Sequence, residues 1–366
     1  MKIAINATIL DNKPTGLGTF TINIIKELST LINDKNSIIV YTSTPSIFDG
    51  YPVTVKKVSP VVQPQKGKFG GLMRFLWSQI IFPLRIKKDK IDILYSTTHH
   101  GLIINSTKQI ITIHDILPLK YPHQYKLQYY YFKFILPILI KKSKRIITVS
   151  NNTKKDLVSN YHISDKIIDV IYNSFDKEHF SNVSSNEYKE KFGDYLLFVG
   201  ASYPHKNLER AIKAFISLDI DSKYKLIIVG GREKYKNWVK QQFSQQQLKN
   251  VHFIDYVNYE KLPVLYSNAK ALIYPSLYEG FGIPPLEAMA SGCPVIASNT
   301  SSIPEVCQDA AFYFNPESIS EISYAIRTVL NDNNLREDLI QKGFKRVNQF
   351  SWRESARKLL EIILKV

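Results

Sequence analysis

The sequence is poor in cysteine, in long apolar runs and in acidic residues, and each shortage excludes a class of protein. Only Cys293 and Cys307 occur among 366 residues, too few for a disulfide framework or a cysteine-rich metal site. The longest apolar runs, such as residues 134–140, fall far short of the roughly 18 residues that a membrane-spanning helix needs. The first six residues turn polar too soon for a signal peptide. We therefore expect a cytoplasmic protein without a transmembrane anchor.

The shortage of acidic residues leaves a strongly basic chain. There are 48 Lys and Arg against 32 Asp and Glu, a net charge of +16, which suggests nucleic acid, a membrane surface or a phosphorylated substrate as partner. The excess is uneven, because residues 1–180 carry 25 basic and 12 acidic side chains while the remainder carries 23 and 20. The two halves are thus expected to do different jobs. No nucleic-acid-binding motif is present, so we expect no nucleic acid partner.

The chain is too long for one ordinary core, which predicts two domains. Short β-branched runs alternate with amphipathic helix-length segments, a pattern typical of parallel sheets wrapped by helices. It stops in a polar stretch at 176–191 and then restarts, so we place the boundary near residue 180: an N-terminal domain 1–180, a C-terminal domain 181–350 and a helix 351–366 that packs back on the first domain. The predicted strands are 2–9, 38–42, 91–95, 109–113, 145–149 and 167–171, then 195–200, 225–230, 251–254, 271–274, 294–297 and 311–314.

Two motifs in the first half follow predicted strands. Residues 15–20, Thr-Gly-Leu-Gly-Thr-Phe, open a helix, where Gly16 and Gly18 allow a ligand close to the backbone and free N–H groups attract phosphate. The alternative is a tight turn between strand and helix. His114 and Asp115 end a buried strand and point into the ligand-binding edge of such a sheet. The alternative there is a helix-capping Asp beside a structural His.

The second half of the chain contains two further motifs. Lys206, in Pro-His-Lys-Asn-Leu at 204–208, places a cation at a helix entrance, which suits a diphosphate, although a solvated lysine is the simpler alternative. At 275–290, a glycine loop lies between a strand and a helix that has Pro285 in its first turn. Glu279 lies in that loop and Glu287 in that helix. The two carboxylates can bind hydroxyls at two places on a ligand whose anionic middle meets the amides of 280–283.

Taken together, these motifs resemble the retaining glycosyltransferases of family 4, which have the GT-B fold: two facing Rossmann-like domains with parallel sheets and a cleft between them. The resemblance also covers Thr148-Val149-Ser150, Asn173 to Asp176 and Ser351-Trp352. It implies a metal-independent, retaining hexosyltransferase without a cofactor, in which the C-terminal domain binds a nucleotide-sugar and the N-terminal domain the acceptor.

The resemblance also implies roles for individual residues. Glu287 would hold the ribose hydroxyls, while Glu279 and His114 would lie beside the transferred sugar, and His114, Glu279 and Lys206 would form the catalytic set. Lys206 and the backbone at Gly18 would stabilise the leaving diphosphate. The remaining predicted donor-binding residues are Gly16, His205, Gly280, Phe281, Gly282 and Ile283.

Three positions depart from the family pattern. An arginine usually lies close to the lysine, whereas here the neighbour is His205 and positions 201–204 offer none. Diphosphate stabilisation is then weaker, pH-dependent through His205, or supplied elsewhere, for instance by Arg232. The usual Asn-Gly turn is Asn173-Ser174. Asp255 replaces a glycine near the expected base site, so base recognition does not carry over.

The acceptor side combines basic and aromatic residues at 66–90 and 120–145. Such helices suit peripheral contact with the anionic inner face of the cytoplasmic membrane and a lipid-linked acceptor; ordinary packed helices with lysines on the wet face are the alternative. The resemblance is greatest to the mannosyltransferase-like branch. The prediction is therefore transfer of a hexose, first mannose from GDP-mannose, to a glycan or lipid-linked glycan in surface polysaccharide (lipopolysaccharide) synthesis. The alternatives are a UDP- or dTDP-sugar donor, a non-catalytic subunit that binds a sugar-nucleotide or a glycan, and a GT-B phosphorylase or epimerase.

Overall fold

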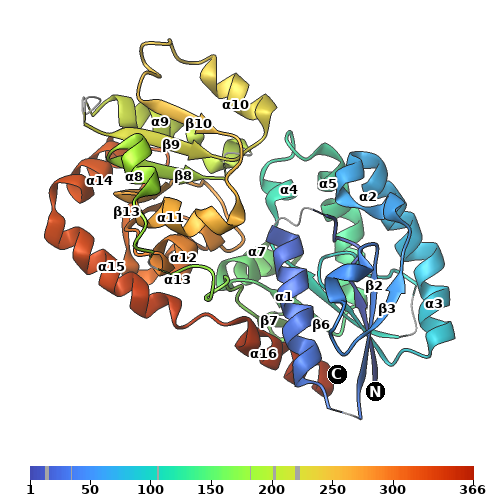
Figure 1. Cartoon of the computed structure of the whole chain (residues 1–366). Coiled ribbons are helices and arrows are strands. Elements are labelled where there is room, and N and C mark those ends of the chain that lie inside the picture. The colour runs from blue at the N-terminus through green and yellow to red at the C-terminus, as the bar shows by residue number, and fades with distance from the viewer. Residues whose placement is uncertain (13–15, 34, 105–106, 182, 201–202, 219–222) are drawn as a thin grey trace. The chain divides into compact units, whose positions relative to one another are not determined.

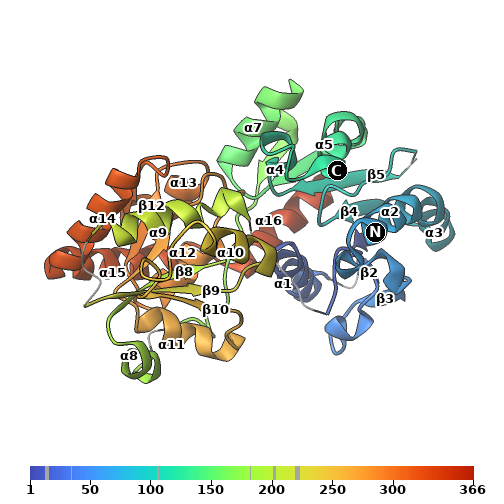
Figure 2. The ribbon, with the colours of Figure 1, turned by 90° about the horizontal axis from the view of Figure 1, so that it is seen from above.

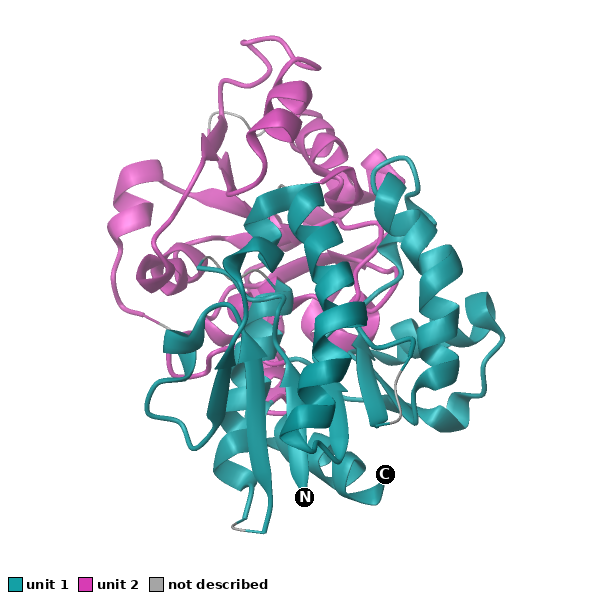
Figure 3. Ribbon diagram, turned by 90° about the vertical axis from the view of Figure 1, so that its right-hand side faces the viewer, with its two compact units in different colours: residues 1–173, 351–366 teal, residues 174–350 magenta. Residues whose placement is uncertain are grey.

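The computed structural model describes residues 1–12, 16–33, 35–104, 107–181, 183–200, 203–218 and 223–366. The chain divides into two compact units, residues 1–173 with 351–366, and residues 174–350 (Figure 3). The division falls earlier in the chain than the boundary expected near residue 180. The C-terminal segment 351–366 belongs to the first unit. Thr15, Ala201 and Ser202, which the motifs above include, lie outside the described residues.

The first unit is built on a seven-stranded, entirely parallel sheet in the order β3-β2-β1-β4-β5-β6-β7. Its inner strands β1, β4 and β5 are buried along almost their whole length, as expected for a parallel sheet covered by helices on both faces. The strands are β1 (Lys2–Asn6), β2 (Ser37–Thr42), β3 (Thr54–Lys57), β4 (Ile93–Ser96), β5 (Lys108–Ile113), β6 (Arg145–Thr148) and β7 (Ile168–Val170).

The helices of this unit include two long segments that run from α2 to α3 and from α5 to α6. Each contains a π-helical turn, η4 and η5, followed by a proline at the second position of the next helix. The helical elements are α1 (Gly16–Leu31), η1 (Pro45–Phe48), η2 (Pro60–Val62), η3 (Pro64–Lys66), α2 (Gly67–Leu76), η4 (Trp77–Ile81), α3 (Phe82–Asp89), α4 (Leu117–Lys120), α5 (Lys126–Tyr130), η5 (Tyr131–Ile135), α6 (Leu136–Lys142), α7 (Asn151–Tyr161), η6 (Asp165–Ile167) and α16 (Trp352–Lys365).

Helix α16 lies against α1 in both views (Figures 1 and 2). Ser351 caps it by accepting a hydrogen bond from the Glu354 N–H, and its apolar face is buried. Trp352 packs edge-on against Phe20 of α1, with ring centroids 6.0 Å apart. Ser355 donates a hydrogen bond to the Tyr172 carbonyl. This last helix therefore completes the first unit although it follows the second in sequence.

The second unit has a six-stranded parallel sheet in the order β10-β9-β8-β11-β12-β13, the strand order of a Rossmann fold. Its strands are β8 (Tyr195–Val199), β9 (Lys225–Val229), β10 (Val251–Ile254), β11 (Ala271–Tyr274), β12 (Val295–Ser298) and β13 (Ala311–Phe314). Its helical elements are α8 (Glu187–Phe192), η7 (Pro204–Lys206), α9 (Leu208–Ile216), α10 (Glu233–Lys240), η8 (Tyr259–Lys261), α11 (Leu262–Ser267), α12 (Ile283–Ala290), α13 (Ile303–Cys307), η9 (Gln308–Ala310), α14 (Ile319–Asn331) and α15 (Asn333–Val347).

The predicted strands all exist, with ends that differ by one to a few residues, and one further strand was missed. Strand β3, Thr-Val-Lys-Lys, lies at the sheet edge with no fully buried residue, so its sequence lacks the apolar run that marks an inner strand. Both cysteines are free and buried, in agreement with the prediction of no disulfide framework. Within the described residues, every helix falls short of the length and hydropathy needed to cross a bilayer.

Candidate functional site

The centre of the second sheet is the point where the chain changes direction. Strands β8 and β11 are neighbours there, and the chain proceeds to β9 on one side and to β12 on the other. The loops that leave the carboxyl ends of such a pair diverge and form the ligand-binding edge of doubly wound sheets. The backbone N–H of Leu277 donates to the His205 carbonyl across them, at 2.8 Å. The described part of the first loop, residues 203–207, is therefore joined to the loop at 275–282.

Asn207 fixes the first loop to the second. Its backbone is left-handed, with φ of 63°, a conformation that asparagine tolerates better than most residues. Its side-chain amide donates to the carbonyls of Pro275, at 3.1 Å, and Pro316, at 2.7 Å. The helix α9 begins at the next residue. This asparagine explains why Lys206 is held in one place at the start of that helix.

Lys206 and Glu279 meet at this edge. The Lys206 Nζ lies 2.6 Å from Glu279 Oε1, and the two side chains are 19% and 11% exposed. Burial acts to raise the pKa of Glu279, but the charge and hydrogen bond of Lys206 outweigh it, so that the pKa is lowered. The ammonium group also lies 5.6 Å from the centre of the Tyr274 ring. Glu279 is therefore an ionised hydrogen-bond acceptor, unsuited to act as a proton donor at neutral pH.

Two serines after β12 hold the glycine loop in shape. The Ser301 hydroxyl accepts a hydrogen bond from the Glu279 N–H and donates to the carbonyl of the same residue. Ser302 donates to the carbonyls of Glu279 and Phe281. Gly282 has φ of 107°, which only glycine adopts readily, and it leads into α12. The loop backbone at Gly280, Phe281, Gly282 and Ile283 is thus preset by its neighbours, as an anion-binding loop requires.

Glu287 lies in α12 and is partly buried. The Tyr266 hydroxyl of α11 donates to its Oε2 at 2.9 Å. Burial raises the pKa of Glu287 to about 7, although the bond from Tyr266 acts to lower it. This carboxyl therefore differs from Glu279, because it changes charge near neutral pH. Its tyrosine partner could not be identified from spacing, since Tyr266 belongs to a helix that precedes β11.

His205 is buried and does not supply the charge of the missing arginine. Burial lowers its pKa to about 4, so the imidazole is neutral at pH 7. Its ring stacks on Tyr203, with centroids 5.5 Å apart, and the Arg232 guanidinium lies 4.3 Å from the centre of that tyrosine ring. The pH-dependent alternative through His205 does not fit this lowered pKa, and the role of Arg232 as a second cation stays a prediction.

Asp255 forms an ion pair with Lys236 of α10. The lysine side chain is only 4% exposed while the aspartate side chain is 88% exposed. The hydrogen bond from Lys236 lowers the pKa of Asp255. The substitution of aspartate for glycine after β10 is thus matched by a lysine whose charge would otherwise be buried without an ion-pair partner.

Three predicted site residues belong to the first unit. Gly16 and Gly18 lie in the first turn of α1. The His114 ring Nε2 lies 2.9 Å from the Thr97 carbonyl, and its ring packs edge-on against Phe20, with centroids 4.7 Å apart. Burial lowers the pKa of His114 to about 4, so the ring is neutral and Nε2 donates to the carbonyl.

The alternative suggested for His114 and Asp115 has structural support. Asp115 accepts a hydrogen bond from the Leu117 N–H at the start of α4, at 2.9 Å, and His114 has the backbone partner described above. These bonds orient the imidazole without using its Nδ1. The roles of Gly16, Gly18 and His114 toward a donor stay predictions.

Several residues that shape these loops were missed in the sequence. Tyr266, Ser301 and Ser302 contact the carboxylates or carbonyls of the site, and Tyr274 lies under Lys206. A polar run at 298–302 after a buried strand was the available signal for the serines. The described residues contain no group of three or more His, Cys, Asp or Glu side chains placed to hold a metal ion.

Comparison with known proteins gives matches over most of the chain. Residues 14–179 match the model of Glycosyltransferase Family 4, and residues 176–346 match that of Glycosyl transferases group 1. The O-antigen chain mannosyltransferase RfbU of Salmonella typhimurium is 35% identical over 329 residues, which cover 89% of this chain and 90% of RfbU. The O-antigen chain mannosyltransferase B of Escherichia coli is 27% identical and covers 96% of both chains.

Among solved structures, the crystal structure of Anabaena Alr3699/HepE in complex with UDP is similar throughout. Its TM-score is 0.78 at 18% identity, with 100% of both chains covered. The two parallel-sheet units described above are thus the Rossmann-like domains of the GT-B fold. With the family models and the identity to RfbU, these observations confirm the resemblance inferred from the motifs: the chain belongs to the family 4 glycosyltransferases and is a glycosyltransferase of the mannosyltransferase-like branch.

Proposed function

We propose that the protein transfers mannose, with retention of configuration, from a nucleoside diphosphate mannose to a glycan or lipid-linked glycan of the cell surface. GDP-mannose is the first candidate donor. The observation that carries the proposal is the Lys206–Glu279 pair at the β8–β11 switch point, 2.6 Å across. The similarity to two O-antigen chain mannosyltransferases supports the sugar and the pathway, and the UDP-bound relative of the same fold supports a nucleotide donor.

The charge balance of this edge suits a diphosphate. Lys206 is neutralised by Glu279 in the absence of ligand, and Arg232 lies on the Tyr203 ring nearby. A bound diphosphate would compete for Lys206 and leave the Glu279 carboxylate to accept hydrogen bonds from sugar hydroxyls. The leaving charge would then be offset by two cations and by the amino end of α12, without a metal ion.

Retention is proposed to proceed without a protein nucleophile. Glu279 is bonded to Lys206, and its lowered pKa keeps it ionised. In this proposal it positions the sugar, and the acceptor hydroxyl attacks from the face that the diphosphate leaves. Glu287 is proposed to accept hydrogen bonds from the ribose hydroxyls, for which its ionised form offers more acceptor sites than the protonated one.

We further propose that the enzyme works at the inner face of the cytoplasmic membrane. The first unit exposes large apolar side chains on helices that also carry lysines, and a surface of this kind favours contact with anionic lipid. Sedimentation with vesicles of anionic and of zwitterionic lipid tests this, with binding expected only to the anionic ones at low salt. The exposed residues are Phe69, Leu72, Leu76, Ile80, Ile81, Leu84, Leu127, Tyr130, Phe134 and Ile138.

The experiment that tests the donor is thermal unfolding with GDP, UDP, dTDP and ADP, each also as its common sugar conjugate. A ligand at about 100 times its dissociation constant adds roughly 2.7 kcal/mol, which raises the midpoint by several degrees. A shift with GDP and GDP-mannose alone is expected. A shift with UDP or dTDP instead would name a UDP- or dTDP-sugar as the donor. No shift with any nucleotide would favour a non-catalytic glycan-binding subunit. Product configuration and turnover in EDTA then test retention and metal independence.

A further inference from the structure

The first unit has its own switch point, between β1 and β4, and the loop after β4 is held there by many bonds. Asn6 and Ser96 both donate to the His100 carbonyl, each at 3.0 Å. The side chain of Gln109 pairs with both backbone groups of Leu102. The segment that carries His99 and His100 is thus fixed at the edge of the sheet where doubly wound folds bind ligands.

The two π-helical turns reach the same loop. Gln79 of η4 donates to the Gly101 carbonyl and accepts from the Ile103 N–H, at 2.9 and 3.0 Å. Tyr131 of η5 donates to the His99 carbonyl at 3.1 Å. Prolines that follow each turn cannot donate to the helix ladder, which favours the wider turn before them. Such turns occur often at functional sites.

Arg74 of α2 is a buried cation beside this loop. It is 5% exposed, and its Nε donates to the Val62 carbonyl at 3.0 Å. No carboxylate among the described residues forms an ion pair with it; Asp11 acts on it only through a weaker charge interaction. Burial lowers its pKa to about 10, so it remains charged at pH 7. A buried cation without an ion-pair partner is costly, which points to an anionic ligand.

Besides Asp11, the groups on which the charge of Arg74 acts are three uncharged hydrogen-bonding side chains, His99, His100 and Tyr131. His99 and His100 are partly exposed, with ring centroids 4.3 Å apart, and the Tyr131 ring lies 5.4 Å from His99 and 6.0 Å from His100. Burial lowers the pKa of His99 to about 3. The cluster therefore offers one fixed cation and neutral imidazoles, a set that can bind a phosphate group.

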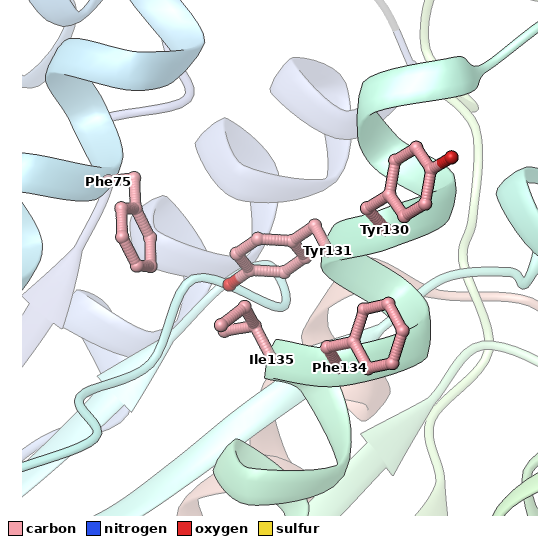
Figure 4. A pocket seen from close by; sticks show the side chains of 5 residues that line it. All are labelled: Phe75, Tyr130, Tyr131, Phe134 and Ile135. Carbon is pink, nitrogen blue, oxygen red and sulfur yellow. The ribbon is translucent and has the colours of Figure 1, made fainter.

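An apolar cleft begins at the same tyrosine. It has a volume of about 320 Å³ and lies between α2 and the facing segment α5–η5. Phe75 and Tyr131 point toward one another across it (Figure 4), with ring centroids 6.0 Å apart. Its outer part is open, since Tyr130 and Phe134 are 59% and 56% exposed. The lining residues are Phe75, Tyr130, Tyr131, Phe134 and Ile135.

We propose that this part of the first unit binds an acceptor lipid phosphate, with the phosphate at Arg74, His99 and His100 and the hydrocarbon chain in the cleft. The inference rests on the proposed function and names the substrate class of its acceptor. Tyr131 contacts both parts, so the polar and apolar features form one amphiphilic site. A free phosphate would leave the cleft unused, and an uncharged chain would leave Arg74 without its anion.

Binding of decyl phosphate, kept below its micellar concentration, tests the proposal by calorimetry on the full chain. Inorganic phosphate and decanol are the two partial probes. Decyl phosphate is expected to bind more tightly than either by about tenfold or more, since each partial probe lacks one class of contact. Equal affinity for inorganic phosphate, equal affinity for decanol, or no binding of decyl phosphate would each overturn it.

Variants locate the site. Arg74→Gln is expected to weaken decyl phosphate binding by about tenfold or more. Phe134→Ser, at an exposed position that tolerates change, is expected to weaken it by about three- to tenfold. Tyr324→Ser, at a similarly exposed position in the second unit, 65% against 56% for Phe134, is the control and is expected to change decyl phosphate binding less than twofold. Wild-type affinity in Phe134→Ser overturns the proposal even if Arg74→Gln does not fold.

The nucleotide screen separates this inference from the proposed function. Nucleotide binding is proposed for the second unit, and transfer to a short soluble glycan needs no contact with the apolar cleft, so both should survive Phe134→Ser. Loss of lipid phosphate binding with both of these intact supports the acceptor site. Failure of nucleotide binding in the wild-type protein, with decyl phosphate still bound, would remove the proposed function and leave the phosphate site standing.

Discussion

In the second unit, the lysine at the β8–β11 switch point meets a carboxylate 2.6 Å away. In the first unit, Arg74, beside the loop after β4, has no ion-pair partner among the described residues. The sheets have the same parallel architecture around their switch points. Because the fold supplies the edge and the loops supply the chemistry, two similar domains can take different ligands.

The charge of the sequence follows the same division. Residues 51–150 contain 17 basic and three acidic residues, whereas the second unit is nearly balanced. The first unit thus has spare positive charge and an apolar cleft, as expected of a domain that binds an amphiphilic anion. In the second unit, Lys206 and Glu279 form an ion pair, and a polar ligand can replace the contact between them with contacts to itself.

The largest expected effect is on transfer activity, and it comes from breaking the Lys206–Glu279 ion pair of the second unit. Glu279→Gln removes the carboxylate proposed to position the sugar, and transfer is expected to fall by about 10² to 10³. The nucleotide-induced thermal shift should remain, because Lys206 is still present. Release of nucleoside diphosphate from the donor measures the effect. Glu317→Gln, the same change at an exposed loop residue, is the control, and equal transfer in both variants would contradict the assignment.

Asn207 tests whether the two loops of the second unit depend on each other. Asn207→Ala removes the donor to two carbonyls and places alanine in a left-handed conformation. The free energy of unfolding is expected to fall by about 2 to 4 kcal/mol. Asn207→Gly keeps the backbone freedom and should lose about 1 kcal/mol less. Equal losses in urea unfolding would show that the backbone conformation contributes nothing.

Glu287 tests the difference in pKa between the two carboxylates of the site. Its pKa is raised to about 7 in the folded protein, so the native state binds the proton more tightly than the unfolded chain does. Its ionisation therefore lowers stability as pH rises from about 4.5 to 7, and the loss is complete above pH 7. Glu287→Gln should raise the free energy of unfolding by about 1 to 3 kcal/mol at pH 8.

The same variant should have little effect on stability at pH 4, where the wild-type carboxyl is protonated in both states. At pH 8 Glu287→Gln should bind nucleotide more weakly than the wild-type protein does, because the amide accepts fewer hydrogen bonds from a ribose than a carboxylate does. Urea unfolding at the two pH values checks the first expectation. A stability gain of the same size at both would mean that ionisation is not its cause.

Gly16 gives the smallest expected change in stability. A Cβ at this position meets nothing within 4 Å, and the residue lies at the start of α1. Gly16→Ala is expected to change the free energy of unfolding by less than about 0.5 kcal/mol. Loss of transfer with unchanged stability would favour the phosphate-binding interpretation of the motif over the tight turn. Unchanged transfer would favour the turn.

The architecture could be predicted from the sequence alone. Apolar, β-branched runs separated by helix-length segments predict parallel sheets, because an inner strand is buried on both faces and has no polar side to alternate with. Strand β3 was not predicted, because it lies at the sheet edge, where its lysines face solvent and no apolar run marks it. The motifs at Lys206, Glu279 and Glu287 could be recognised from their positions in the sequence, because each comes after a buried strand or opens a helix.

Only the packing of the folded chain brings these side chains into contact and sets the charge state of each. Lys206 and Glu279 are 73 residues apart, and their ion pair exists because β8 and β11 are neighbours in the sheet. Sequence spacing carries no such information. The raised pKa of Glu287, the lowered pKa of His205 and the lowered pKa of the buried Arg74 all depend on burial by residues distant in the chain. Burial and pairing set the cost of charge, and only the packed chain determines both.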